Sequence, residues 1–304
     1  MLARAGGRLQ AAFSGIPPLP RAMLLMVFST LCFSSQHALI RYASTRLGYH
    51  GFEITFFRNF FGLLTLAPVF WQHGLAVFDT RVPHLHLARG GLQVATMLMF
   101  FYAVTITPLA LSSALSFTGP LFASVLAVLV LRERPHARRV LALVAGFAGA
   151  LILLRPGVVP LGLGPALILG STFIWSFAML IIKVMARTES PVTMTAYMSA
   201  ILTPTTLLPA LFVWRWPDAE AYLVFFGLGF VGTIGHLAFA QAFKLADTTA
   251  VLPLDFTRLL WASLFGFFIF AEVPQPWTWV GGMVIFAAAT YLSIQEARAK
   301  RPDN

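Results

Sequence analysis

The chain has 304 residues, of which 58% are hydrophobic and only 11% are charged. A soluble domain usually carries about 25% charged residues, so this composition excludes a water-soluble globular protein and indicates a polytopic membrane protein. The formal net charge of +10 does not indicate nucleic-acid binding, because the basic residues are scattered through short segments without a soluble module. The single cysteine, Cys32, lies inside an apolar run and excludes an intramolecular disulfide.

Runs of about 20 apolar residues predict ten transmembrane helices, since only helices and closed barrels satisfy every backbone hydrogen bond in lipid. Residues 1–21 contain no hydrophobic region of the signal-peptide type, so we expect the first span to be retained after a short cytoplasmic segment. The predicted fold is an all-α integral membrane protein. Its spans are expected at residues 22–42, 52–71, 90–107, 109–131, 137–154, 163–183, 193–213, 221–243, 248–271 and 277–294.

Lys and Arg residues are concentrated in alternate connections between the spans, which predicts the orientation. With the N-terminus inside, most of the 21 basic residues fall on the inner side. The outer segments contain only Arg41, Arg46, Arg155 and Arg215. We therefore expect a multi-pass protein of a bacterial inner membrane with both termini, including the tail at 296–304, in the cytoplasm.

The sequence contains an internal repeat. The segment FTGPLFAS, Phe117 to Ser124, matches FTRLLWAS, Phe256 to Ser263, and Glu133 then aligns with Glu272. Near the start of each half, Ser29, Thr30, Ser34 and Arg41 align with Ser171, Thr172, Ser176 and Lys183. Each half, residues 22–155 and 163–295, has five spans, so the second half enters the membrane from the opposite side. Two inverted five-helix repeats are a common construction of secondary transporters.

In these features the chain resembles the EamA-type members of the drug/metabolite transporter superfamily, over nearly its whole length. Each half closes with a helix, a Glu-containing turn and a last apolar helix: SFTGPLFASVLAVLVLRERP with VLALVAGFAGALILLRPG, and DFTRLLWASLFGFFIFAEVP with WTWVGGMVIFAAATYL. The resemblance implies a proton-linked or exchange-type carrier, not an enzyme. It leaves the substrate open, because carriers of amino acids, riboflavin, S-adenosylmethionine and opine-type metallophores belong to this family.

Asp255 and Arg258 interrupt the ninth apolar span. At about 1.5 Å of rise per residue they lie roughly 10 and 15 Å from its cytoplasmic end, where a charge costs at least about 2.5 kcal/mol. One interpretation is mutual neutralisation, since positions i and i+3 share a helix face. The other is a substrate site, in which Arg258 binds a carboxylate while Asp255 takes an ammonium group or the coupling proton. The repeat partners Ser116 and Gly119 are uncharged, which favours the second interpretation.

Four further polar residues of the spans extend the predicted site. His236 lies level with Asp255 and is a candidate for proton coupling, with a hydrogen-bonded packing role as the alternative. Gln36 is expected to contact the substrate. His37 and Arg58 are expected to form an outer gate, and the alternative for Arg58 is snorkelling to the interface or an ion pair with Glu53.

Ser116, Trp175 and Tyr102 complete the predicted substrate-binding set. The two aromatic residues lie inside spans rather than at their ends, where interfacial aromatics belong, so we expect them to line the site. An aromatic wall can stack on a planar or cationic ligand. Simple packing is the alternative for each.

Several motifs do not indicate a second activity. The segment GLGFVG, Gly227 to Gly232, lies in a predicted transmembrane helix without a preceding strand, so it indicates close helix packing rather than dinucleotide binding. His84 and His86 are expected in a solvated loop rather than a metal site. The sequence contains no Walker A and no hydrolase motif, so we expect that the protein is neither an ATP-driven pump nor an enzyme. We also expect no metal and no cofactor.

The expected function is secondary-active transport of a small amphipathic metabolite, zwitterionic and amino-acid-like, of the opine-metallophore or S-adenosylmethionine type. We expect export rather than uptake, with protons as the candidate coupling ion. Two alternatives stay open. One is a carrier of a planar, riboflavin-like solute with a purely structural charged pair; the other is a scaffold or channel without saturable flux. No motif identifies the substrate, the direction of transport, the coupling mode or the oligomeric state.

Overall fold

The computed structural model describes residues 17–65, 67, 71, 74, 78–131, 137–155, 162–185, 188–189, 191–246 and 251–299. These residues form helices at all ten predicted spans, which confirms the all-α fold. The first half contains α2 (Pro18–Thr45), α3 (Gly51–Thr65), α5 (Pro83–Ile106), α6 (Leu109–Ser116), α7 (Gly119–Leu131) and α8 (Ala137–Leu154). The second contains α9 (Leu163–Met185), α10 (Pro191–Leu211), α11 (Ala219–Leu245), the 3-10 helix η2 (Leu252–Phe256), α13 (Thr257–Phe270) and α14 (Pro276–Ala299).

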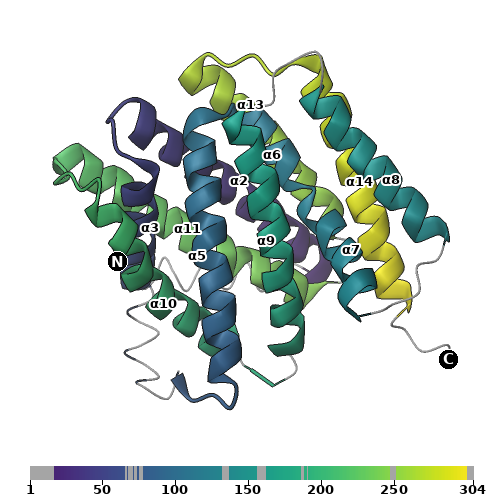
Figure 1. The fold of residues 1–304 in the computed structure, drawn as a ribbon, viewed down its shortest axis with the longest axis horizontal. Coiled ribbons are helices and arrows are strands. Elements are labelled where there is room, and N and C mark those ends of the chain that lie inside the picture. Colours follow the sequence, from purple (N-terminus) through teal and green to yellow (C-terminus); the bar gives the residue numbers. More distant parts are fainter. Residues whose placement is uncertain are drawn as a thin grey trace.

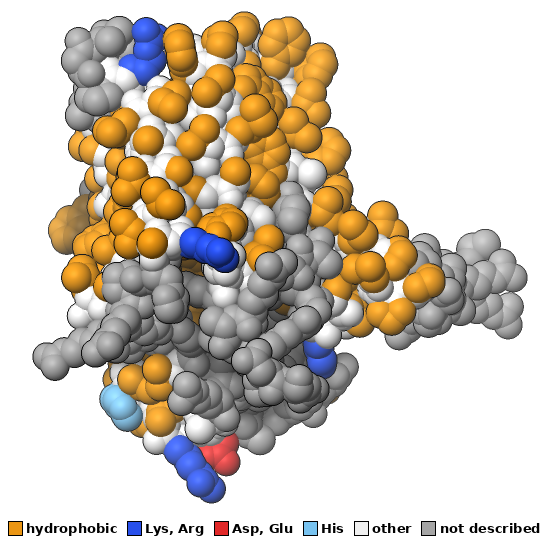
Figure 2. All heavy atoms as spheres, turned by 90° about the vertical axis from the view of Figure 1, so that its right-hand side faces the viewer, with side chains coloured by type: hydrophobic (Ala, Val, Ile, Leu, Met, Phe, Trp, Pro, Cys, Tyr) orange, Lys and Arg blue, Asp and Glu red, His pale blue; other side chains and the backbone are white. Residues whose placement is uncertain are grey.

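The surface of the helix bundle is apolar, as a lipid environment requires. On α8, Leu141 and Leu151 are 69% and 57% exposed. Hydrophobic side chains cover most of the described surface in the upper part of Figure 2. Within the described residues, five segments are long and apolar enough to cross a bilayer: Pro18–Thr45, Pro83–Ile106, Leu109–Leu126, Leu163–Ile182 and Ala219–Leu245.

The contacts between the two halves follow the inverted repeat. Helix α2 packs on α11 and α13, and the corresponding helix of the second half, α9, packs on α5 and α7. Helices α3 and α10, corresponding members of the two halves, meet at one edge of the bundle, and α8 meets α14 at the other (Figure 1). The core is divided accordingly, with one apolar cluster around Tyr49, Phe57 and Phe225 and another around Leu115, Leu121 and Ile285.

The α-helical hydrogen bonding of the fourth span is interrupted in each half, contrary to the continuous helices expected at 109–131 and 248–271. In the second half the interruption is a 3-10 helix that continues directly into α13, and we call both interruptions helix breaks. In the first half, α6 ends at Ser116 and α7 begins at Gly119. The intervening turn uses short-range bonds, from Phe117 N to Ala114 O at 3.2 Å and from Thr118 N to Leu115 O at 3.0 Å. In the second half, η2 takes the place of the first helical turns. Pro120 and Pro253, which cannot donate a helical hydrogen bond, lie at these two sites.

Helix α5 begins seven residues earlier than predicted, at Pro83, a residue type favoured at the first helical position. His84 and His86 therefore lie in a helix, and the solvated loop expected there is wrong. The His86 side chain is 1% exposed and lies 3.3 Å from a Glu189 carboxylate oxygen. Its ring stacks on Tyr197 with 4.2 Å between centroids.

Candidate functional site

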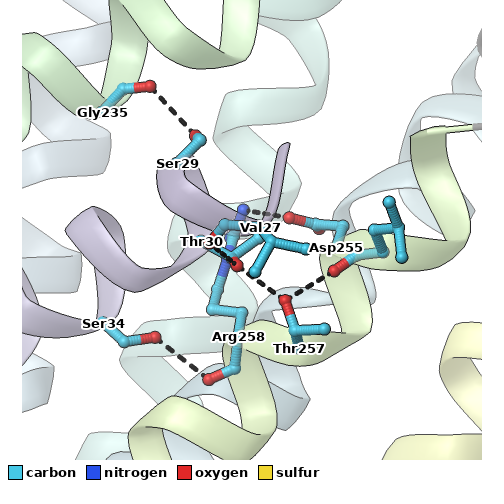
Figure 3. A network of polar contacts seen from close by, with 9 residues as sticks. Val27, Ser29, Thr30, Ser34, Gly235, Asp255, Thr257 and Arg258 are labelled. Carbon is cyan, nitrogen blue, oxygen red and sulfur yellow. Dashed lines mark hydrogen bonds and ion pairs between the residues drawn. The ribbon is translucent and has the colours of Figure 1, made fainter. Parts of the chain in front are cut away.

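The charged pair lies at the break between η2 and α13. Arg258 Nη2 donates to Asp255 Oδ1 over 2.7 Å, and the two side chains are 18% and 16% exposed. Helix α2 contacts both the backbone and the side chain of Arg258. Ser34 Oγ donates to the Arg258 carbonyl at 3.0 Å (Figure 3), and the guanidinium carbon lies 5.2 Å from the centre of the Phe33 ring. The predicted pairing of Asp255 with Arg258 is present, and the pair remains partly accessible.

Threonines join the halves at both helix breaks. Thr30 Oγ1 of α2 lies 2.6 Å from Thr257 Oγ1 at the start of α13 (Figure 3). The repeat-related pair, Thr172 of α9 and Thr118 at the start of α7, is 3.2 Å apart. Since the same pair occurs twice, with opposite polarity in the membrane, it belongs to the shared scaffold.

The two breaks differ in what lies beside the threonines. Extending the repeat alignment places Phe33 on Trp175 and Arg258 on Gly119. A Cβ added to Gly119 would lie 3.2 Å from the Trp175 ring, so the indole fills the space that an arginine uses in the other half. Ser116, the partner of Asp255, donates to the Ser112 carbonyl of its own helix at 2.7 Å. One half-site is charged and the other is filled by an aromatic ring.

A second polar cluster lies where α2, α3 and α11 meet. A Cβ on Gly232 would collide with Gln36 Nε2 and lie 3.3 Å from Arg58 Nη2, so both side chains approach the α11 backbone through the space that glycine leaves. Arg58 is only 8% exposed. Its Nη1 donates to Asn59 Oδ1 at 3.0 Å, and Asn59 Nδ2 donates to Thr206 Oγ1 at 3.4 Å.

The expected alternative of an Arg58–Glu53 ion pair is not formed. The Glu53 carboxylate instead accepts from the backbone N–H groups of His50, at 3.0 Å, and of Arg215. These bonds cap the start of α3 and tie it to the segment after α10. Arg58 therefore has no carboxylate in contact among the described residues.

The two predicted histidines pack on different phenylalanine rings. His37 is 7% exposed and packs on Phe100 with 5.1 Å between centroids. The His236 ring meets Phe33 edge-on at 4.8 Å. His236 makes no hydrogen bond to Asp255, both being described residues, so the structure brings them into one region without pairing them. Arg58, Arg258 and Arg89 all act electrostatically on His236.

Tyr102 lies apart from these residues. Its ring packs near His50, with 5.5 Å between centroids, and near Phe52 at 6.3 Å, against the start of α3. It therefore lies at the end of the bundle that the charge distribution assigns to the outside, away from Arg258.

Arg41 and Glu272 form an ion pair that sequence analysis did not select as a site. Their side chains meet at 2.6 Å, Arg41 also donates to the Thr107 carbonyl, and Glu272 accepts from Leu109 N at 2.9 Å. Ala271, in the left-handed conformation at φ 56°, ends α13 and turns the carboxylate inward. The pair joins the two halves at the end of the bundle that the charge distribution predicts to be outside. The internal repeat could have indicated this pair, because Arg41 and Glu272 align with the charged residues Lys183 and Glu133. Glu133 and the Lys183 side chain lie outside the described residues.

A cavity of about 300 Å³ lies next to this ion pair, at the same end of the bundle, and is lined by residues of α6, α8, α13 and α14. Ser263, Gly266 and Glu272 contribute to its lining. Its carboxylate is already engaged by Arg41 and Leu109 N, so the charged cluster around Arg258 is the stronger candidate for substrate recognition. Within the described part of the chain, no group of three His, Cys, Asp or Glu residues could hold a metal ion.

Comparison with known proteins agrees with this architecture. An S-adenosylmethionine uptake transporter of Rickettsia felis is 32% identical over 276 residues, covering 90% of this chain and 92% of the relative. A riboflavin transporter of Vibrio cholerae is 28% identical, covering 91% and 94%. A pseudopaline exporter of Pseudomonas aeruginosa is 29% identical, covering 90% and 96%. These names differ in substrate while the overall similarity is nearly equal.

One solved crystal structure shares the fold, with a TM-score of 0.61 and 16% identity over 92% of this chain and 99% of that one. The family model described as the EamA-like transporter family matches residues 20–155 and again 162–294. Together these two matches include every helix discussed above. The chain belongs to the EamA-like transporter family and is a multi-pass membrane transporter of small metabolites.

Proposed function

We propose that the chain is a secondary-active carrier of a small amphipathic metabolite with an amino-acid-like, zwitterionic head. The observation that carries this proposal is the Arg258–Asp255 pair, which lies at a helix break and keeps 18% and 16% of its side chains exposed. Transporter sites commonly lie at such discontinuous helices between inverted repeats. A guanidinium beside a carboxylate offers a partner for each end of an amino acid.

The comparison of the two half-sites supports a functional rather than a structural pair. Gly119 and Ser116 stand at the same repeat positions without charge, and the helix break and the threonine contact form there as well. The charges are therefore not required for the shared packing. In this proposal Arg258 binds the carboxylate, Asp255 takes the ammonium group or a proton, and Trp175 forms the apolar wall on the opposite half.

The remaining predicted residues take roles around this centre. Gln36 lies on α2 one turn beyond Phe33, and His236 lies against the same ring. His37 and Arg58 lie toward the predicted outer side, where we assign them to the gate. The proposed direction is export from the cytoplasm across a bacterial inner membrane, the direction named for the Pseudomonas relative.

Ligand-induced stabilisation tests this proposal, because a ligand that binds the native state raises the melting temperature. Purified wild type, Arg258→Ala and Arg46→Ala are heated with amino acids, an opine, S-adenosylmethionine or riboflavin. Arg46 is an exposed arginine at the end of α2 and serves as the control. We expect an amino-acid-like compound to stabilise wild type and Arg46→Ala but not Arg258→Ala. Equal stabilisation of all three proteins by riboflavin would favour the planar-solute alternative.

A further inference from the structure

Arg58 has hydrogen-bonding capacity that the described residues leave unused. It is 8% exposed, its Nε atom has no partner, and its one hydrogen bond goes to the neutral Asn59 amide. A buried guanidinium without an anion is costly in a membrane. Such a residue therefore calls for an anionic partner that the described part of the protein does not supply.

Gln36 adds a second free donor at the same place. Its Nε2 atom is buried without a partner, and both this atom and Arg58 Nη2 lie against the Gly232 backbone. A side chain at this position would displace Gln36 Nε2 from where it now lies. Two donors from different helices thus converge on one region, and no carboxylate of the described residues accepts from either.

This cluster lies within electrostatic reach of the proposed amino-acid site. His236, one turn after Gly232 on α11, experiences the charges of both Arg58 and Arg258. The two clusters are also linked along α2. Gln36 lies one turn after Phe33, whose ring centre is 5.2 Å from the Arg258 guanidinium carbon. A ligand bound at Arg258 would therefore have to extend about one helical turn along α2 to reach Gln36.

The charges of the two clusters are unequal. Asp255 balances Arg258, whereas Arg58 has no carboxylate in contact among the described residues. A zwitterionic head on the Asp255–Arg258 pair leaves the charge of Arg58 in place. A second carboxylate on the same ligand would neutralise it and accept the free donors of Arg58 and Gln36.

We propose that Arg58 and Gln36 bind a second anionic group of the substrate, so that the transported molecule is an amino-acid-like compound with at least two carboxylates and a net negative charge. This inference rests on the proposed function, because the zwitterionic head is assigned to Asp255 and Arg258. It moves Arg58 from the gate into the binding site. It also disfavours a net cation such as S-adenosylmethionine and a neutral solute such as riboflavin.

The test uses pairs of compounds that differ by one charge. L-Glutamate is compared with L-glutamine, and the dicarboxylate opine alanopine with its monoamide, by thermal shift of the purified protein. The variants are Arg58→Gln, Arg58→Lys and the control Arg46→Ala. In wild type and Arg46→Ala we expect the diacid of at least one pair to reach half-saturation at about tenfold lower concentration than its amide. Arg58→Gln should lose this preference while keeping the amide response, and Arg58→Lys should keep part of it.

The outcomes separate the two proposals. An amide response that depends on Arg258, without a preference for the diacid in wild type, overturns the second site and leaves the proposed function standing. A diacid preference that survives in Arg58→Gln also overturns it. If neither member of either pair stabilises wild type, whereas S-adenosylmethionine or riboflavin does, both proposals are wrong. A melting temperature of ligand-free Arg58→Gln near that of wild type shows that the variant is folded.

Discussion

The two helix breaks have the same scaffold and different chemistry. In each, the first helix of one half contacts the fourth span of the other half through a pair of threonines, Thr30 with Thr257 and Thr172 with Thr118. Beside one pair lie Phe33 and Arg258, and beside the other lies Trp175 on Gly119. Aligned positions with the same residue in both halves are explained by the shared packing. Aligned positions with different residues are the ones where substrate recognition can reside.

Because of this difference, one half-site is polar and the other is apolar. An amphipathic metabolite has the same two parts, so its charged head can bind at α13 while its apolar part lies toward Trp175. The relatives named for S-adenosylmethionine, riboflavin and pseudopaline are compatible with one scaffold whose unequal positions carry the specificity.

Introducing a charge into the apolar half-site, at Gly119 and Trp175, should have the largest effect on stability. We expect Gly119→Arg to lower the free energy of unfolding by about 3 kcal/mol or more, because the new side chain meets the Trp175 ring and has no carboxylate partner. Thermal unfolding in detergent measures this. The triple variant Ser116→Asp, Gly119→Arg, Trp175→Phe copies the charged half and should recover part of the loss. A Gly119→Arg protein as stable as wild type contradicts the filled half-site.

Removing one charge from the charged half-site, at Asp255 and Arg258, should have the next largest effect on stability. Asp255→Asn leaves Arg258 without its carboxylate and should cost about 2 kcal/mol of stability. Adding Arg258→Met to it should restore stability without restoring substrate binding. Ser116→Ala, at the matched position of the other half, should change stability by less than about 0.5 kcal/mol. If the double variant also binds substrate normally, the pair is only structural.

The shared scaffold predicts equal effects in the two halves. Thr30→Val and Thr172→Val each remove one interhelical hydroxyl contact while keeping the side-chain shape. Each should lower the free energy of unfolding by about 1 kcal/mol, measured by denaturant or thermal titration. A loss confined to one half would show that the repeat does not hold the breaks in the same way.

The outer ion pair should have the smallest effect on stability and a visible effect on access. Arg41→Gln removes one partner of the pair, but the Glu272 carboxylate keeps its hydrogen bond from Leu109 N. We therefore expect a loss of about 1 kcal/mol, which corresponds to about a fivefold change in an opening equilibrium. In a Cys32→Ser background, Ser263→Cys places a thiol at the neighbouring cavity. A membrane-impermeant maleimide should label it several-fold faster after Arg41→Gln than after the control Arg46→Gln. Equal labelling argues against an outer seal.

Much of the fold follows from the sequence because lipid imposes strong rules. Apolar length identifies the ten spans, and the aligned FTGPLFAS and FTRLLWAS segments identify the repeat. The break after Ser116 could not be predicted, since the apolar run is continuous and Pro120 alone fixes no conformation. The polar segment around His86 predicts a loop, whereas the burial of His86 depends on Glu189, a partner from the other half that local sequence does not reveal.

The site could be predicted in part. The pairing of Asp255 with Arg258 is local, so helix periodicity is sufficient. The environment of Arg58 is not local. It depends on Gly232 of α11 and on Glu53 being engaged by the Arg215 backbone. The Arg41–Glu272 contact likewise joins distant segments, and only the aligned charges of the repeat pointed to it.

The central claim is that Arg258 recognises the carboxylate of a transported metabolite. Exchange in proteoliposomes tests it most directly, with labelled amino-acid-like compounds inside and outside the vesicles. We expect saturable exchange by wild type and Arg46→Ala, and its loss in Arg258→Ala protein that is folded and inserted equally well. Undiminished exchange of the same compound by Arg258→Ala would contradict the claim.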